Sequence, residues 1–147
     1  MKTRNFVLTT SLCFIAAIAF AQETASITVQ VNDIKNSGEG HMVFMLFNKD
    51  DGFPKERQKA FKLGIVEEFG NSASYTFKDV PYGNYAVSVH QDKDADGEMK
   101  SNFIGMPKEP VGASNMTKMG KPNFKKCSFE VDSPEEELDI KFIIGNK

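Results

Sequence analysis

The chain has 147 residues, of which 26% are charged and 40% hydrophobic, a composition typical of one ordinary globular domain. This balance excludes a disordered chain, a collagen-like repeat and a protein with several membrane spans. Eighteen Lys and Arg residues against twenty Asp and Glu leave a formal net charge of −2. The chain therefore has no basic excess with which to bind nucleic acid.

The first residues have the pattern of a secretory signal peptide. Lys2 and Arg4 provide a positive start, and an apolar run over residues 6–20 follows. Ala19 and Ala21 supply the small side chains that precede a signal-peptidase site. The run is shorter than the roughly 20 apolar residues of a membrane-spanning helix. We therefore expect a signal peptide at 1–21, no membrane span after its cleavage, and export to the periplasm or the cell surface.

The mature chain, residues 22–147, is expected to form a single domain. Cys127 is its one cysteine, since the other precedes residue 22. A single thiol cannot form an internal disulfide, so stability must come from an apolar core. We expect Cys127 to pack as a small apolar residue.

Alternation of apolar and polar residues with a period of two dominates the mature chain and predicts half-buried β-strands. The stretches that show it are 26–34, 74–78, 85–90, 129–131 and 138–144. Residues 42–47 are continuously apolar, which predicts a central strand buried on both faces. Only residues 54–62 have a helical composition, with Pro at the first position.

About six strands and one short helix predict an all-β fold, an antiparallel sandwich. The turn before residue 85 supports this prediction. Pro81 fixes φ at its start, Gly83 permits a positive φ, and Tyr85 then begins a strand with its side chain pointing inward. The pattern resembles the strand entry of immunoglobulin-like and transthyretin-like β-sandwiches, in which the Tyr fills one end of the core.

A long loop is predicted over residues 92–125, where neither period is sustained. Such a stretch in a small domain is usually functional, or is ordered by something around which it wraps. It opens with Asp92, Asp94 and Asp96, followed by Gly97, which is the first half of a calcium loop. Calcium prefers hard oxygen ligands. The three carboxylates and the main-chain carbonyl of Glu98 are therefore candidate ligands.

The second half of a calcium loop is not matched. Lys100 stands at position 9, and Phe103 stands at position 12, where a bidentate Glu is usual. Asn102 or a distant acid would have to complete the ligand shell. The predicted calcium affinity is accordingly weak, on the order of 10⁻⁴–10⁻³ M. The alternative is an acidic surface loop whose Asx turns satisfy its own backbone.

Several motifs together resemble an exported bacterial family known as domain of unknown function 2141. They are the Pro-x-Gly-x-Tyr turn, the aspartate loop, and the runs Gly105-Met106-Pro107-Lys108-Glu109, Gly112-Ala113-Ser114-Asn115 and Pro122-Asn123-Phe124. The resemblance covers essentially the whole mature chain. It implies a β-sandwich without a known activity, so it supplies no catalytic residues. The chain departs from the family at Lys100, where Asp is common, and at Val111 and Ala113, where aromatic residues are usual.

Two classes of function remain open. The first is a non-catalytic exported envelope module whose long loop, ordered by calcium, binds a protein or glycan. The second is a small metal-dependent periplasmic hydrolase that uses the aspartates of residues 92–96, with His90 as the base. Ser114 begins a run like a nucleophile elbow, but Met116 occupies the place of the second Gly. The first class is favoured because no second base or oxyanion-donor motif accompanies these residues.

Overall fold

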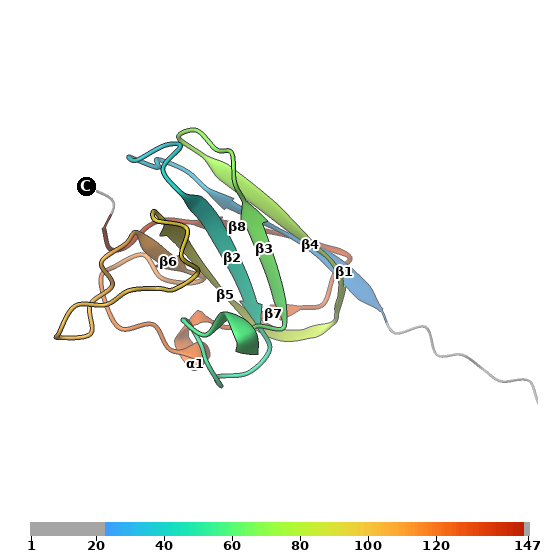
Figure 1. The fold of residues 1–147 in the computed structure, drawn as a ribbon. Coiled ribbons are helices and arrows are strands. Elements are labelled where there is room, and N and C mark those ends of the chain that lie inside the picture. Colours follow the sequence, from blue (N-terminus) through green and yellow to red (C-terminus); the bar gives the residue numbers. More distant parts are fainter. Residues whose placement is uncertain (1–22, 146–147) are drawn as a thin grey trace, which may run out of the picture.

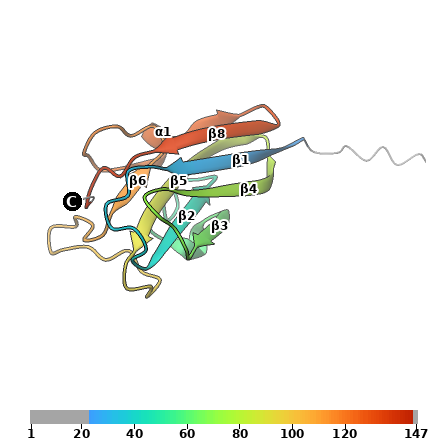
Figure 2. The ribbon, with the colours of Figure 1, turned by 90° about the horizontal axis from the view of Figure 1, so that it is seen from above.

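The computed structural model describes residues 23–145 and shows two β-sheets packed face to face (Figures 1 and 2). The predicted signal peptide lies outside the described residues. No helix in the described part is long and apolar enough to cross a membrane. The strands are β1 Thr24–Val31, β2 His41–Phe47, β3 Lys62–Val66, β4 Ala73–Pro81, β5 Gly83–Asp92, β6 Val111–Ala113, β7 Phe129–Val131 and β8 Glu135–Ile140, and the helical segments are η1 Arg57–Lys59 and α1 Phe124–Cys127.

One sheet has three strands in the order β4-β1-β8. β1 pairs with β4 antiparallel but with β8 parallel, so the prediction of a wholly antiparallel sandwich is wrong for this one pair. The chain passes from β7 in one sheet to β8 in the other through a turn at residues 132–134. This crossing brings β8 alongside β1 in the same direction, and the Ser26 N–H donates to the Pro134 carbonyl at 2.8 Å where the pairing begins.

The other sheet has the order β3-β2-β5-β6, and the short β7 pairs with the first residues of β5. The main core lies between the two sheets. Ile27, Val29 and Val31 of β1 are fully buried there, together with alternate residues of the facing strands β2 and β5. The predicted period of two is confirmed for β1, in which every second residue points into the core. In β5, Tyr85, Val87 and Val89 also belong to this core, but both faces of the strand are buried, so the prediction of a half-buried strand is wrong there.

A second, smaller apolar layer covers the outer face of the five-stranded sheet. Val43, Met45 and Phe47 of β2 are fully buried, although they point away from the main core. Phe53 and Phe124 pack over them from the loop before η1 and from α1. This confirms the prediction of a central strand buried on both faces. It also means that loops outside the sandwich close over one sheet, and the candidate site lies among these loops.

Several predicted boundaries change. The helix predicted at 54–62 is reduced to the three residues of η1, which bury no side chain and so gain no packing energy to extend a helix. Strand β3 was not predicted, and the last strand covers 135–140 rather than 138–144. The long segment 92–125 is interrupted by β6 and ends in α1. Cys127 is free and buried in α1, as predicted.

Candidate functional site

Strand β6 divides the predicted long loop into two, residues 93–110 and 114–123. The first of these loops folds back on itself. Ser101 and Pro107 form an isolated β-bridge, and the Lys108 N–H donates to the Lys100 carbonyl at 2.9 Å. These contacts close residues 100–108 into a hairpin, and the hydrogen bond from the Lys93 N–H to the Glu109 side chain joins the two ends of the loop. They leave the tip exposed to solvent, where Phe103 is 99% exposed.

Asp92 is the last residue of β5 and organises the turn that follows it. Its side chain is only 1% exposed. One carboxylate oxygen accepts the Asp96 N–H at 3.2 Å, and the other accepts the Gly97 N–H at 2.9 Å. The Nη2 atom of Arg57 donates to this second oxygen at 2.9 Å. Asp92 thus closes the loop onto η1, and its first oxygen retains a free lone pair.

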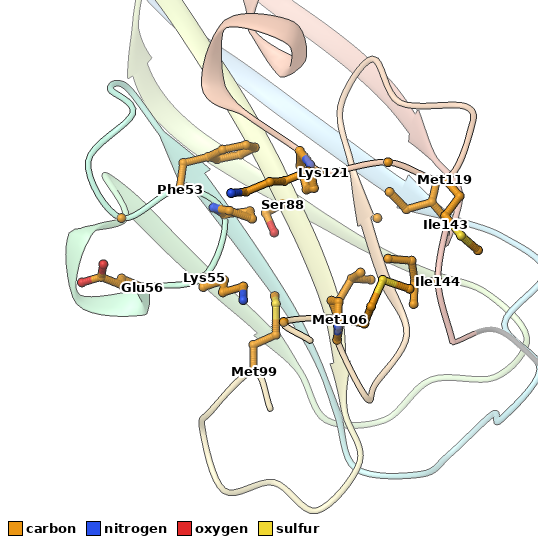
Figure 3. A pocket seen from close by; sticks show the side chains of 18 of the residues that line it. Phe53, Lys55, Glu56, Ser88, Met99, Met106, Met119, Lys121, Ile143 and Ile144 are labelled. Atoms are coloured by element: carbon orange, nitrogen blue, oxygen red, sulfur yellow. The ribbon is translucent and has the colours of Figure 1, made fainter. Parts of the chain in front are cut away.

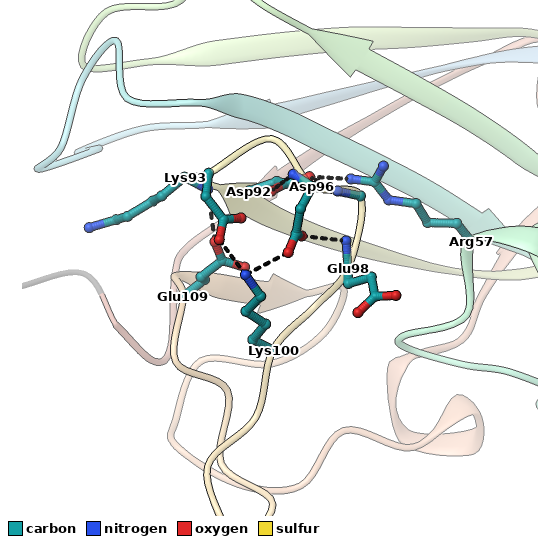
Figure 4. Close-up of polar contacts among 9 residues, drawn as sticks. Arg57, Asp92, Lys93, Asp96, Glu98, Lys100 and Glu109 are labelled. Carbon is teal, nitrogen blue, oxygen red and sulfur yellow. Dashed lines mark hydrogen bonds and ion pairs between the residues drawn. The ribbon is translucent and has the colours of Figure 1, made fainter.

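Asp94 and Asp96 lie next to Asp92, and one carboxylate oxygen from each of the three lies within 4.8 Å of the others. The predicted grouping of these acids is therefore present. The ammonium of Lys100 pairs with both Asp94 and Asp96 (Figure 4). These contacts raise the pKa of Lys100 well above its ordinary value and lower the pKa of Asp96. The ammonium of Lys100 is therefore the cation that lies among the aspartates in this structure.

Glu109 adds a fourth carboxylate from the far end of the same loop. Its Oε1 accepts the Lys93 N–H at 2.8 Å, while its Oε2 is buried and has no hydrogen-bond partner among the described residues. The residue is 6% exposed, and Figure 4 shows its carboxylate directed toward the aspartate loop. Burial raises the pKa of Glu109, and the charges of the three aspartates raise it further. Oε2 of Glu109 is therefore a buried oxygen that no donor among the described residues satisfies.

The four carboxylates, Asp92, Asp94, Asp96 and Glu109, form what we call the acidic cluster. Within residues 23–145, two cationic side chains form ion pairs with them: Arg57 pairs with Asp92, and Lys100 pairs with Asp94 and Asp96. The cluster therefore keeps an excess of negative charge at the base of the loop. A divalent cation is the simplest partner that would neutralise it.

Comparison with known families gives one result. A family model described as an uncharacterized protein conserved in bacteria (DUF2141) matches residues 29–139. The chain belongs to the DUF2141 family. No curated protein and no solved structure gives a significant match to it. The resemblance inferred from the sequence motifs is thereby confirmed, and the matched range of this DUF2141 chain includes the whole acidic cluster.

Two further residues of the DUF2141 loop were predicted as ligands. The N–H of Glu98 donates to the Asp96 carboxylate at 2.9 Å, and the Glu98 side chain points away from the cluster (Figure 4). Its main-chain carbonyl, which is the group predicted from the sequence, is then the candidate ligand of this residue. The side-chain oxygen of Asn102 accepts the N–H groups of Ile104 and Met106 at 3.1 and 2.9 Å. Asn102 is therefore used to shape the tip of the loop.

His90 lies beneath the cluster and is completely buried. Neither ring nitrogen has a hydrogen-bond partner among the described residues. Burial and, next, the charge of Arg57 lower the pKa of His90 to about 4, against the opposing effect of Asp92 and Asp96. The imidazole is therefore neutral at physiological pH and closed off from solvent. A substrate outside the protein does not reach it.

Two residues of this site were not predicted from the sequence. Glu109 approaches the three aspartates from the far end of the loop and contributes to their electrostatics, and its place after Pro107 and Lys108 was its only signal. Arg57 lies 35 residues before Asp92. It falls within the helix predicted over residues 54–62, and no spacing connects it to the aspartates.

Proposed function

We propose that this protein is a non-catalytic module of the bacterial envelope whose loop 93–110 is ordered by a divalent cation, and that the ordered loop binds a protein or glycan. Calcium is the ion of choice, because all candidate ligands are hard oxygens and no Cys or His belongs to the acidic cluster. The main-chain carbonyl of Glu98 would add an oxygen to those of the four carboxylates. Export is inferred from the N-terminal residues.

The observation that carries the proposal is the position of Glu109. Three aspartates in a loop are common on protein surfaces without any ion. A buried glutamate with an unpartnered oxygen beside three aspartates is not, because its charge raises the energy of the folded state unless a cation is close. The loop also pairs Lys100 with Asp94 and Asp96. We interpret this ammonium as a competitor of calcium, which accounts for a weak affinity.

The proposal of a partner rests on the tip of the loop. Phe103 is 99% and Ile104 67% exposed, and both lie on the loop whose base holds the acidic cluster. An aromatic side chain held in solvent by a rigid loop is the kind of residue that anchors protein interfaces. Ordering the base with a cation would fix the position of this anchor and so lower the entropic cost of binding.

The two candidate catalytic side chains of the hydrolase alternative are both buried. His90, the candidate base, is fully buried. Ser114, the candidate nucleophile, is 2% exposed, and its hydroxyl donates to the Cys127 carbonyl at 2.6 Å and accepts the Val87 N–H at 2.9 Å. Its hydrogen bonds hold β5, β6 and α1 together. The hydrolase alternative therefore gains no support from these two residues.

The test is thermal unfolding of the mature protein in calcium and in EDTA. Millimolar calcium should raise the melting temperature of the wild type, because the ion binds the folded loop only. Glu109→Gln keeps the shape of the side chain and the acceptor for Lys93 but removes the charge, so it should abolish the calcium effect. Lys100→Gln removes the competing ammonium. It should lower the calcium concentration at half-effect by about tenfold.

The matched control is Glu68→Gln, an exposed glutamate in the turn between β3 and β4. Its calcium response should equal that of the wild type. The proposal fails if calcium shifts none of the proteins, or if it shifts Glu109→Gln as much as Glu68→Gln. It also fails if Lys100→Gln is destabilised and calcium does not restore it, since Lys100 would then be a purely structural partner of the aspartates.

A further inference from the structure

The structure contains a pocket of ≈ 670 Å³ on the outer face of the five-stranded sheet (Figure 3). Its floor includes Ser88 of β5 and Gly112 of β6. Its walls come from segments that are far apart in the chain: residues 52–56 before η1, 99–107 of the first long loop, 119–122 of the second, and 143–144 after β8. Its volume is within the range of about 300–1,000 Å³ that holds small-molecule ligands.

The walls of this pocket are mainly apolar. The large apolar side chains that line it are Phe53, Met99, Ile104, Met106, Met119, Ile143 and Ile144. Methionine side chains are flexible and polarisable, and they adapt to ligands of irregular shape. A pocket of this size with such walls holds water at a cost, and an apolar ligand would replace that water.

Two ammonium groups give the pocket a charged side. Lys55 and Lys121 both line it, and Figure 3 shows their side chains extending over it from opposite loops. The Lys55 ammonium also donates to the Ser101 hydroxyl at 3.1 Å. The one acid in the lining is Glu56, whose carboxylate pairs at 3.2 Å with Lys59, an ammonium that also pairs with Asp51. Two cationic side chains thus line the pocket against one acid. The charge left facing the pocket is positive.

We infer that this pocket binds a small anionic amphiphile, a carboxylate with an unbranched apolar chain. The carboxylate would lie between Lys55 and Lys121, where charge-assisted hydrogen bonds are available. The chain would lie along Met99, Met106 and Ile144. This site is separate from the acidic cluster, whose residues do not line the pocket. It gives the module a second ligand besides the proposed cation.

The test is calorimetric titration with decanoate and, separately, with 1-decanol, which has the same chain and no charge. Wild-type protein should bind decanoate saturably at one site per chain. A double variant, Lys55→Gln with Lys121→Gln, should bind decanoate about tenfold more weakly and decanol without change. Both lysines are exposed, so the fold should tolerate the two substitutions.

The matched control is the double variant Lys118→Gln with Lys125→Gln, which removes the same charge from exposed positions outside the pocket. It should bind decanoate like the wild type. The titrations are run in EDTA and repeated in calcium, while the melting assay of ligand-free protein tests the cation site on its own. Absence of saturable decanoate binding under both conditions overturns the inference. Equal loss of affinity in the two double variants also overturns it, because the lysines of the pocket would then have no specific role.

Discussion

Tyr85 shows how a single side chain joins sequence pattern and packing. Its ring is buried at the end of the main core, and its hydroxyl donates to the Pro81 carbonyl at 2.8 Å across the turn that leads into β5. Gly83 adopts a φ of 157° in that turn. The predicted role of the Pro-x-Gly-x-Tyr sequence as a strand entry is thereby confirmed.

Burial raises the pKa of Tyr85 above its ordinary value of 10.0. The unfolded chain therefore releases this proton first, and the free energy of unfolding should fall as pH rises above about 10. At neutral pH, Tyr85→Phe should lower the free energy of unfolding by about 1 kcal/mol relative to the wild type, the value of a typical hydrogen bond. Between neutral and alkaline pH, the free energy of unfolding of Tyr85→Phe should fall less than that of the wild type. Urea unfolding at pH 7 and pH 11 measures both effects. An equal fall in the free energy of unfolding of both proteins between pH 7 and pH 11 would contradict a contribution from Tyr85.

Among the elements, β3 has an unusual burial pattern, because its apolar side chains are exposed and its glycine is buried. Leu63 and Ile65 are 41% and 43% exposed, whereas Gly64 points inward and is buried. A side chain at Gly64 would overlap the ring of Tyr75. That ring is fixed in turn, since it stacks on Phe44 with ring centroids 5.9 Å apart. The missing side chain of Gly64 therefore lets β4 approach β3 at the edge of the sandwich.

Gly64→Ala should consequently destabilise the protein by about 1–3 kcal/mol, the usual cost of overpacking a well-filled site. Gly70→Ala is the matched control, because a Cβ at Gly70 meets nothing within 4 Å. It should change the free energy of unfolding by less than about 0.5 kcal/mol. Urea denaturation of both variants measures the difference. If the two substitutions have the same effect, Tyr75 does not depend on Gly64 for its position.

The elements that could be predicted are those with local signals. The strands β1, β2, β4 and β5 each bury alternate or continuous apolar residues, and a short window of sequence shows this. β3 escaped prediction because its apolar side chains face solvent and a glycine takes the inner position. The parallel pairing of β8 with β1 escaped as well, because it joins residues about 110 positions apart and depends on the path of the chain between the sheets.

On the scale of the whole molecule, the acidic cluster and its partner Arg57 come from three regions of the chain. The three aspartates share one short loop, so their spacing alone predicted their grouping. Arg57 and Glu109 reach the same place from η1 and from the residues before β6, and only the fold brings them together. The walls of the pocket likewise come from four separate segments of the chain. Both features depend on loops that close over the outer face of one sheet.

A crystal structure of the mature protein grown in excess calcium would test the central claim most directly. The account predicts one calcium ion with oxygens of the four carboxylates of the acidic cluster and the main-chain carbonyl of Glu98 roughly 2.3–2.6 Å away, and a Lys100 side chain displaced into solvent. Lys100 still paired with Asp94 and Asp96, with no ion beside Glu109, would contradict it.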